Sequence, residues 1–329
     1  MIDTKNPYKT PHTFRRLLVW TVTTTFAVIV LGAWVRVAGA GLACPDWPQC
    51  YGQWLPFPPP DGGYVVGNVT FTTGQVLLEW GHRLLAAVAG FLFLGVLFFA
   101  VQLRRENARF LPLALAALVA LFVQVNLGGM TVLLDNINWS VALHLGTALI
   151  FYTCLMLLLM AAIRPPQSSG IKAAGVNAVI LWAAPVVVYM TMLLGAMVST
   201  SHGGGACGGL FDCAGRWLPA DDPVQALHMI HRYAGLLTLL TAIALFLALR
   251  TQAAALAKTG RVFMIFTLIQ AFVGVLVLYS FSHYAWAYQG LSVFHLAWGT
   301  IVYTIALTGV VKHLWGAKDP AAKTLPGHP

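Results

Sequence analysis

Two segments far apart in the sequence share a His-Arg pair but differ three positions before the histidine. Residues 79–83 read EWGHR and residues 228–232 read HMIHR, so Glu79 of the first segment corresponds to His228 of the second. In a helix, a carboxylate three residues before a histidine lies one turn away on roughly the same face. Glu79 is therefore a candidate proton donor or acceptor beside an imidazole. A structural ion pair with a nearby arginine is the alternative that these residues leave open.

Four histidines recur as two pairs, one in each half of the chain: His82 with His144, and His231 with His295. Each lies near the same end of a membrane-length apolar segment, where ionisable side chains are rare and usually functional. Two imidazoles on facing helices can ligate one heme iron, so two hemes are expected, one in each half. Zinc or copper is disfavoured, because neither half has a compact set of His, Cys and carboxylate ligands. A core histidine that hydrogen-bonds across helices is the alternative for each of them.

Three arginines lie close to these candidate ligands. Arg83 and Arg232 each directly follow a histidine, and Arg36 lies at the end of the first apolar segment. A guanidinium forms bidentate hydrogen bonds with carboxylates and a heme carries two propionates, so all three are candidate cofactor-binding residues. Structural ion pairing, or snorkelling toward lipid headgroups, is the alternative. His228 is expected to contact a propionate or to line the second site, but not to be a ligand.

The composition requires a lipid bilayer around these residues. Of 329 residues, 59% are hydrophobic and only 9% are charged. Too little polar surface remains to cover a soluble globule, and runs of roughly 20 apolar residues can cross a membrane as helices. Eight such runs predict an all-α integral membrane protein, at 17–37, 76–101, 111–134, 140–163, 174–200, 224–249, 262–282 and 290–311.

The net charge of +9 indicates membrane topology and gives no sign of nucleic-acid binding. Of the 19 basic residues, 15 precede the first apolar run or follow an even-numbered one. The positive-inside rule then predicts that both termini lie in the cytoplasm. The expected location is a bacterial-type cell membrane. The two long connections, 38–75 and 201–223, are expected outside.

The chain is a duplicated four-helix unit. Residues 31–44, LGAWVRVAGAGLAC, match residues 194–207, LGAMVSTSHGGGAC, at an offset of 163. Because each unit has an even number of spans, both cross the membrane in the same sense. A pseudo-twofold axis along the membrane normal should therefore relate two tandem four-helix bundles. The expected domains are an N-terminal half at 1–163, a C-terminal half at 174–311 and a cytoplasmic tail at 312–329.

Both long outer connections contain two cysteines at the same spacing. The first reads CPDWPQC from Cys44 to Cys50, and the second reads CGGLFDC from Cys207 to Cys213. Because the outer compartment is oxidising, a disulfide in each loop is the expected state. Each pair could be a structural clasp over its bundle, or a thiol–disulfide pair that exchanges electrons. The first pair is the better redox candidate, because it belongs to the half that contains Glu79.

Together these motifs resemble the heme A synthase family. They are ExxHR at the second span, a second HR at the sixth, a histidine at the fourth and eighth, Cys-x5-Cys in both outer loops, and eight spans in two copies. The similarity extends over about residues 15–315. It implies an enzyme that oxidises the C8 methyl of heme O in steps to a formyl group, with oxygen from water. The product, heme A, is used in assembly of terminal oxidases.

The resemblance also implies a division of roles between the two halves. In the C-terminal half, His231 and His295 would ligate a resident heme b. In the N-terminal half, His82 and His144 would hold the substrate heme O. Glu79 would be the essential acid or base, and Cys44 with Cys50 the cysteine pair implicated in catalysis. The implied partners are heme O synthase, an electron acceptor or donor and oxidase assembly factors, and a homo-oligomer is open.

Three other functions fit these residues less well. A non-catalytic two-heme electron carrier linked to quinol would use the same four histidines, but hemes at a single depth transfer electrons across a membrane poorly. A metal or solute transporter would need a polar path through the midplane, where these spans are almost wholly apolar. A heme prenyltransferase would need paired Asp-rich motifs for a magnesium-bound diphosphate, and the sequence has none.

Overall fold

The computed structural model describes residues 11–163, 176–201, 203–219, 221–252 and 254–315. Eight helices in this part of the chain are long and apolar enough to cross a membrane, which confirms the predicted all-α class. They are α1 (His12–Val37), α2 (Thr73–Gln102), α3 (Phe110–Leu133), α4 (Asn138–Ile163), α5 (Val176–Thr200), α6 (Pro223–Leu249), α7 (Ala254–His283) and α8 (Ala285–Trp315). The first outer loop adds a hairpin of β1 (Val65–Val66) and β2 (Val69–Thr70), and the second adds the 3-10 helix η1 (Gly203–Gly205).

Several helices extend beyond the apolar runs that predicted them. α7 begins at Ala254 rather than at 262, so Lys258 and Arg261 lie in the helix and not in a connection. Lysine and arginine are good helix formers, and a hydropathy pattern detects only the lipid-spanning centre of a helix. The start of the predicted fifth span, 174–175, and the predicted tail beyond residue 315 lie outside the described residues.

Side-chain caps fix the starts of the two helices that carry the His-Arg pairs. At α2, Thr72 and Gln75 form a reciprocal capping box, in which each side chain bonds the backbone of the other. At α6, the Asp222 carboxylate accepts hydrogen bonds from two backbone amides of the first turn, and Pro223 takes the first helical position. These caps set how far into each helix the functional residues lie.

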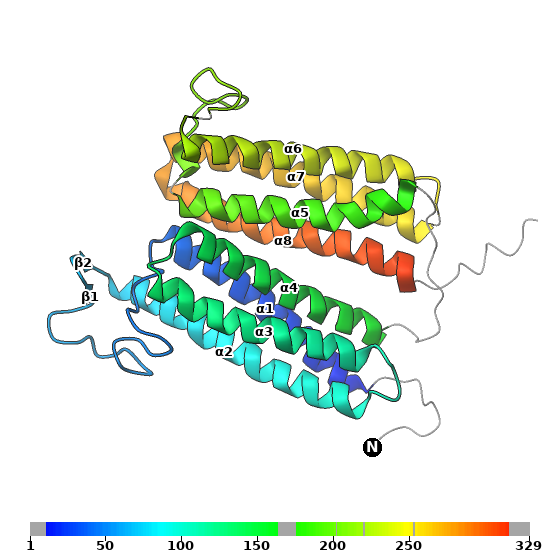
Figure 1. Cartoon of the computed structure of the whole chain (residues 1–329), viewed down its shortest axis with the longest axis horizontal. Helices are drawn as coiled ribbons and strands as arrows, with labels where there is room; N and C mark the ends of the chain where they lie inside the picture. Colours follow the sequence, from blue (N-terminus) through cyan, green and yellow to red (C-terminus); the bar gives the residue numbers. More distant parts are fainter. Residues whose placement is uncertain (1–10, 164–175, 202, 220, 253, 316–329) are drawn as a thin grey trace, which may run out of the picture.

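Figure 1 shows two groups of four helices lying side by side, α1–α4 and α5–α8. α1 and α4 of the first group contact α5 and α8 of the second group. Both long loops project from the same end of the helices, at the left of Figure 1. The two cysteine loops therefore share one side of the molecule, as the count of spans requires.

A reciprocal pair of contacts joins α4 to α8 across the boundary between the groups. The Tyr152 hydroxyl lies 3.2 Å from Oγ1 of Thr304, and Oγ1 of Thr153 lies 2.8 Å from the Tyr303 hydroxyl. Both tyrosines are buried. Such an exchange, in which each helix offers the same Tyr-Thr pair to the other, is the relation expected of two copies around a twofold axis. The axis itself remains a prediction.

Candidate functional site

Each of the four histidines packs against a glycine on the preceding helix. A Cβ placed on any of these glycines would lie 2.9 to 3.1 Å from Cε1 of the imidazole, closer than side chains normally approach. The pairs are Gly32 with His82, Gly128 with His144, Gly195 with His231, and Gly274 with His295. The imidazoles thus reach into space that only a glycine leaves open. Sequence reasoning missed these glycines, although Gly32 and Gly195 both lie in the repeated LG dipeptide.

In the C-terminal half, the His231 and His295 rings face each other across the bundle. Their centroids are 6.5 Å apart and their planes are 83° from parallel. Two imidazoles bound to one metal, each with a nitrogen about 2.0–2.1 Å from it, have ring centres roughly 6 Å apart. Nδ1 of His231 lies 3.2 Å from the Thr191 carbonyl oxygen, a contact that fixes the ring and leaves Nε2 available to a metal. The pair therefore fits axial ligation of one heme iron.

In the N-terminal half, His82 and His144 lie near enough to interact electrostatically. Nδ1 of each is buried and has no hydrogen-bond partner among the described residues, and the same holds for Nδ1 of His295. Buried polar atoms are normally satisfied, and those that are not often mark a functional site. These unsatisfied nitrogens belong to the rings that the heme prediction uses.

Two glutamines hold the histidines of α4 and α8. Nε2 of Gln124 lies 3.2 Å from Nε2 of His144, and Nε2 of Gln270 lies 3.3 Å from Nε2 of His295. An amide that donates to Nε2 keeps the imidazole proton on Nδ1, and a metal bound at Nε2 would take the place of this amide hydrogen bond. Sequence reasoning missed both residues. The signal was a repeated Q-x3-G, which pairs each glutamine with the glycine that faces its histidine.

Glu79 is 4% exposed and makes two contacts that join α2 to the first outer loop. Its Oε2 accepts a hydrogen bond from the Cys44 backbone amide at 2.8 Å, and its Oε1 forms an ion pair with Arg83. Arg83 also donates to three loop carbonyls, those of Cys44, Asp46 and Gln49. The structural ion pair that the sequence left open for Glu79 is present. A contact between Arg83 and a propionate remains a prediction.

The second half repeats the arginine but not the carboxylate. Arg232 donates to the carbonyls of Cys207, Gly209 and Leu210, so it holds its own loop in the same way. One of its terminal nitrogens lies 3.3 Å from Nε2 of His228, the residue in the place of Glu79. The loop-holding arginine is thus common to both halves, whereas a buried carboxylate beside it belongs to the first half.

Arg36 contacts Ser199, the residue that occupies the corresponding position in the second repeat. Its guanidinium donates to the carbonyl oxygen of Ser199, which stands 163 residues later, and not to Glu79. Its Nε is buried and has no hydrogen-bond partner among the described residues. A cavity of about 210 Å³ adjoins it at the boundary between the two groups of helices and is also lined by Phe281 and Tyr288. Arg36 is therefore separate from the Glu79 contacts.

Both predicted disulfides are present, Cys44–Cys50 and Cys207–Cys213. In each loop the second cysteine is followed by two residues in the left-handed region: Tyr51 and Gly52 in the first, Ala214 and Gly215 in the second. The two loops therefore share a backbone turn although their sequences differ. Cys154 is a free cysteine in α4.

Tyr51 is a further residue of the site that sequence reasoning missed. Its hydroxyl is buried and has no hydrogen-bond partner among the described residues. Burial raises the pKa of Tyr51, and the negative charge of Glu79 raises it further. The phenol therefore keeps its proton more tightly than a solvent-exposed tyrosine does.

The comparisons with known proteins identify the family of this chain. The family model of cytochrome oxidase assembly proteins matches residues 15–307. A heme A synthase of Shouchella clausii is 25% identical over 88% of this chain and 94% of its own length. One from Shewanella oneidensis is 29% identical over 74% and 82%, and one from Symbiobacterium thermophilum is 30% identical over 58% and 60%. The chain therefore belongs to the cytochrome oxidase assembly protein family, as its resemblance to heme A synthases predicted.

Proposed function

We propose that this protein converts heme O to heme A by oxidising the C8 methyl group of heme O to a formyl group. One observation carries the proposal. The histidine pairs, their glycines and the loop-holding arginine are duplicated, but only the first half has a buried carboxylate, Glu79, beside its histidine. Two heme-binding sites, of which only one has an added acid or base, would suit a pair in which one site reacts and the other does not. All three relatives described above are named heme A synthase, and none is named as an electron carrier.

His231 and His295 would hold a resident heme b in the C-terminal half, residues 174–311. The 6.5 Å separation of their rings supports this role, and Thr191 and Gln270 orient them. Bound heme b supplies one-electron transfer.

His82 and His144 would hold the substrate in the N-terminal half, residues 1–163. A difference in helix packing supports this division of roles. Matching helix pairs pack similarly in both halves, except that α2 and α3 pack less closely than α6 and α7. A substrate half must exchange its ligand with the bilayer, whereas a resident cofactor is better retained by a closed bundle.

Glu79 would take protons released at the methyl group. Conversion of a methyl group and a water molecule to a formyl group releases four protons and four electrons, and the electrons leave to an external acceptor. The Cys44 amide and the Arg83 guanidinium fix the Glu79 carboxylate, so its position depends on the loop that the Cys44–Cys50 disulfide closes. We assign the disulfide this positioning role in catalysis. Reduction would open the Cys44–Cys50 loop and remove one constraint on the position of the Cys44 amide. Arg83, Arg232 and Arg36 would meet the propionates only by exchanging carbonyl partners.

The proposed setting is the cell membrane, with both termini in the cytoplasm and the cysteine loops outside. Heme O synthase would supply the substrate, and oxidase assembly factors would receive the product. Because heme O and heme A are poorly soluble outside lipid, both transfers would take place within the membrane.

Heme extraction from cells tests the proposal. Co-expression with a source of heme O should yield heme A by mass analysis, and the purified protein should have a low-spin b-type spectrum. Replacing His231 and His295 by alanine should remove the b-type spectrum. Replacing His82 and His144 should leave that spectrum and abolish heme A. A colourless wild-type protein, or a coloured one that never forms heme A, would exclude the proposal.

A further inference from the structure

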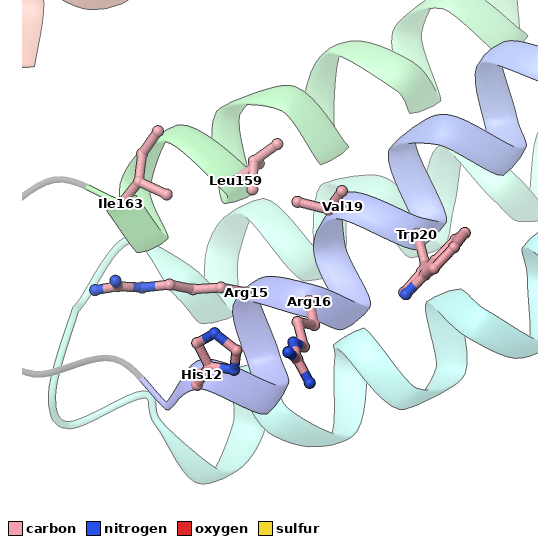
Figure 2. A pocket seen from close by; sticks show the side chains of 7 residues that line it. All are labelled: His12, Arg15, Arg16, Val19, Trp20, Leu159 and Ile163. Atoms are coloured by element: carbon pink, nitrogen blue, oxygen red, sulfur yellow. The ribbon is translucent and has the colours of Figure 1, made fainter.

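A basic pocket of about 440 Å³ lies at the end of the N-terminal half that is opposite the disulfide loops. It is formed by the first turns of α1 and the last turns of α4 (Figure 2). Its lining surface is mainly apolar, and its lining residues include three basic ones, His12, Arg15 and Arg16, beside Val19, Leu159 and Ile163. On the predicted topology, this end of the bundle faces the cytoplasmic leaflet.

The positive charge of the pocket is not neutralised by protein groups that line it, because no carboxylate is among its lining residues. Nε of Arg15 donates to the Ala162 carbonyl oxygen at 3.0 Å, which holds this side chain against the end of α4. Figure 2 shows Arg15 extending from α1 toward the end of α4 that carries Ile163. Arg16 is exposed and makes no hydrogen bond that involves a described residue. The pocket therefore suits an anionic group.

The apolar wall distinguishes a lipid from a free anion. Val19 is 48% exposed, Trp20 63% and Ile163 55%, and all three adjoin the cationic side chains. Val19 and Trp20 follow Arg15 and Arg16 by four residues, so they lie one turn deeper on the same face of α1. A phosphate near the arginines would place an attached acyl chain along these side chains. A tryptophan at this depth is typical of the lipid headgroup level.

The cations are not required by the fold of this helix. At the 163-residue offset of the repeat, Ala178 and Val179 of α5 correspond to Arg15 and Arg16. The second copy thus builds the same helix without these two charges. The arginines are an addition to the N-terminal half.

We propose that this pocket binds an anionic phospholipid, with the phosphate at the basic end of the pocket, near Arg15 and Arg16, and an acyl chain along Val19 and Trp20. Basic residues attract anionic lipid through the negative potential of the leaflet, by roughly a five-fold gain in affinity for each residue near the surface. The site is independent of the proposed reaction.

Native mass spectrometry of the full-length protein tests this site. Wild type would be taken from nanodiscs of phosphatidylcholine that contain a minor fraction of phosphatidylglycerol. We expect at least one retained phosphatidylglycerol per protein, and its loss in the double variant Arg15→Gln/Arg16→Gln. The matched control is Arg104→Gln/Arg105→Gln, which removes the same charge from an exposed loop at the same end of the helices. It should retain the lipid.

Further results discriminate the alternatives. Arg15→Gln also removes the bond to Ala162, so Arg16→Gln alone should lower retention about five-fold with an unchanged helical circular dichroism spectrum. Equal loss in both double variants would show a general effect of surface charge and overturn the proposal. Displacement of the lipid by millimolar inorganic phosphate would identify a free-anion site instead. The proposal would also be overturned if wild type retained no phosphatidylglycerol. The same holds if another protein remained bound over this pocket.

Discussion

The backbone amide of Cys44 donates a hydrogen bond to the Glu79 carboxylate, with 2.8 Å between the amide nitrogen and Oε2. The carbonyl of the same cysteine accepts a hydrogen bond from Arg83, which is the ion-pair partner of Glu79. In the second half, the Cys207 carbonyl accepts from Arg232 in the same way, but among the described residues the position of Glu79 is taken by His228. In each half the arginine, Arg83 or Arg232, therefore holds the outer loop. Glu79 additionally links the first outer loop to α2, the helix that carries His82.

Replacing Glu79 by glutamine should stop formyl formation without loss of bound heme. The amide oxygen can still accept the Cys44 hydrogen bond and Arg83 still holds three loop carbonyls, but the group that takes protons is gone. Loss of a general acid or base costs roughly 10²- to 10⁴-fold in rate. Heme extraction with mass analysis measures the heme A yield, and the optical spectrum measures bound heme b. His228→Gln is the matched control in the second half and should retain most activity. Normal heme A formation by Glu79→Gln would contradict the assigned role.

The two disulfides should differ in their effect on activity but not in their effect on stability. Each closes a loop of the same length, so replacing either cysteine pair by serine should cost about 2 kcal/mol of the free energy of unfolding. Only Cys44→Ser/Cys50→Ser should lower heme A yield beyond this loss, because only that loop positions a carboxylate. Unfolding in detergent and heme extraction, measured for both double variants, separate the effects. Equal loss of activity would indicate that both disulfides act only as clasps.

Gly195→Ala should weaken heme b retention. The new Cβ would lie 2.9 Å from Cε1 of His231, so the ring must move by several tenths of an ångström away from the position that faces His295. Gly235→Ala is the control on the same helix as His231, because a Cβ there meets no atom within 4 Å. It should stabilise the helix slightly. The b-type absorbance per protein after washing in detergent reports the difference. If both variants retain heme equally, the glycine is not needed for the ring position.

The raised pKa of Tyr51 predicts that the first outer loop loses stability at alkaline pH. Its pKa is raised in the folded protein by burial and by the charge of Glu79, so the folded state holds the proton more tightly than the unfolded state. The stabilisation is present below the unfolded-state pKa of about 10 and is lost as pH rises through the folded value. Tyrosinate absorbance, as the difference between wild type and Tyr51→Phe, measures this titration. Glu79→Gln should lower the pKa of Tyr51, and no change would show that the two groups do not interact.

The sequence was sufficient for the parts of the site that depend on the repeat. His82 and His231 could be matched because the segments around them align, and the loop disulfides followed from spacing and compartment. The contacts of Arg36 could not be predicted, because its orientation depends on how two separate groups of helices pack. The glycine beside each histidine was present in the sequence as a repeated residue. It had no meaning until the rotation of each helix about its axis was known.

Tyr152 and Thr304 should be energetically coupled, and the Tyr303–Thr153 contact should have a similar coupling energy. Tyr152→Phe removes one hydroxyl from a buried pair, and hydrogen bonds between membrane helices contribute about 0.6 kcal/mol on average. A double-mutant cycle with Thr304→Val, measured by unfolding in mixed detergent, should give a coupling energy near that value. The cycle of Tyr303→Phe with Thr153→Val should give the same value within error, because the two contacts exchange the same groups between α4 and α8. Coupling in one pair alone would show that the halves meet asymmetrically, and the twofold relation expected from the repeat would then fail at this boundary.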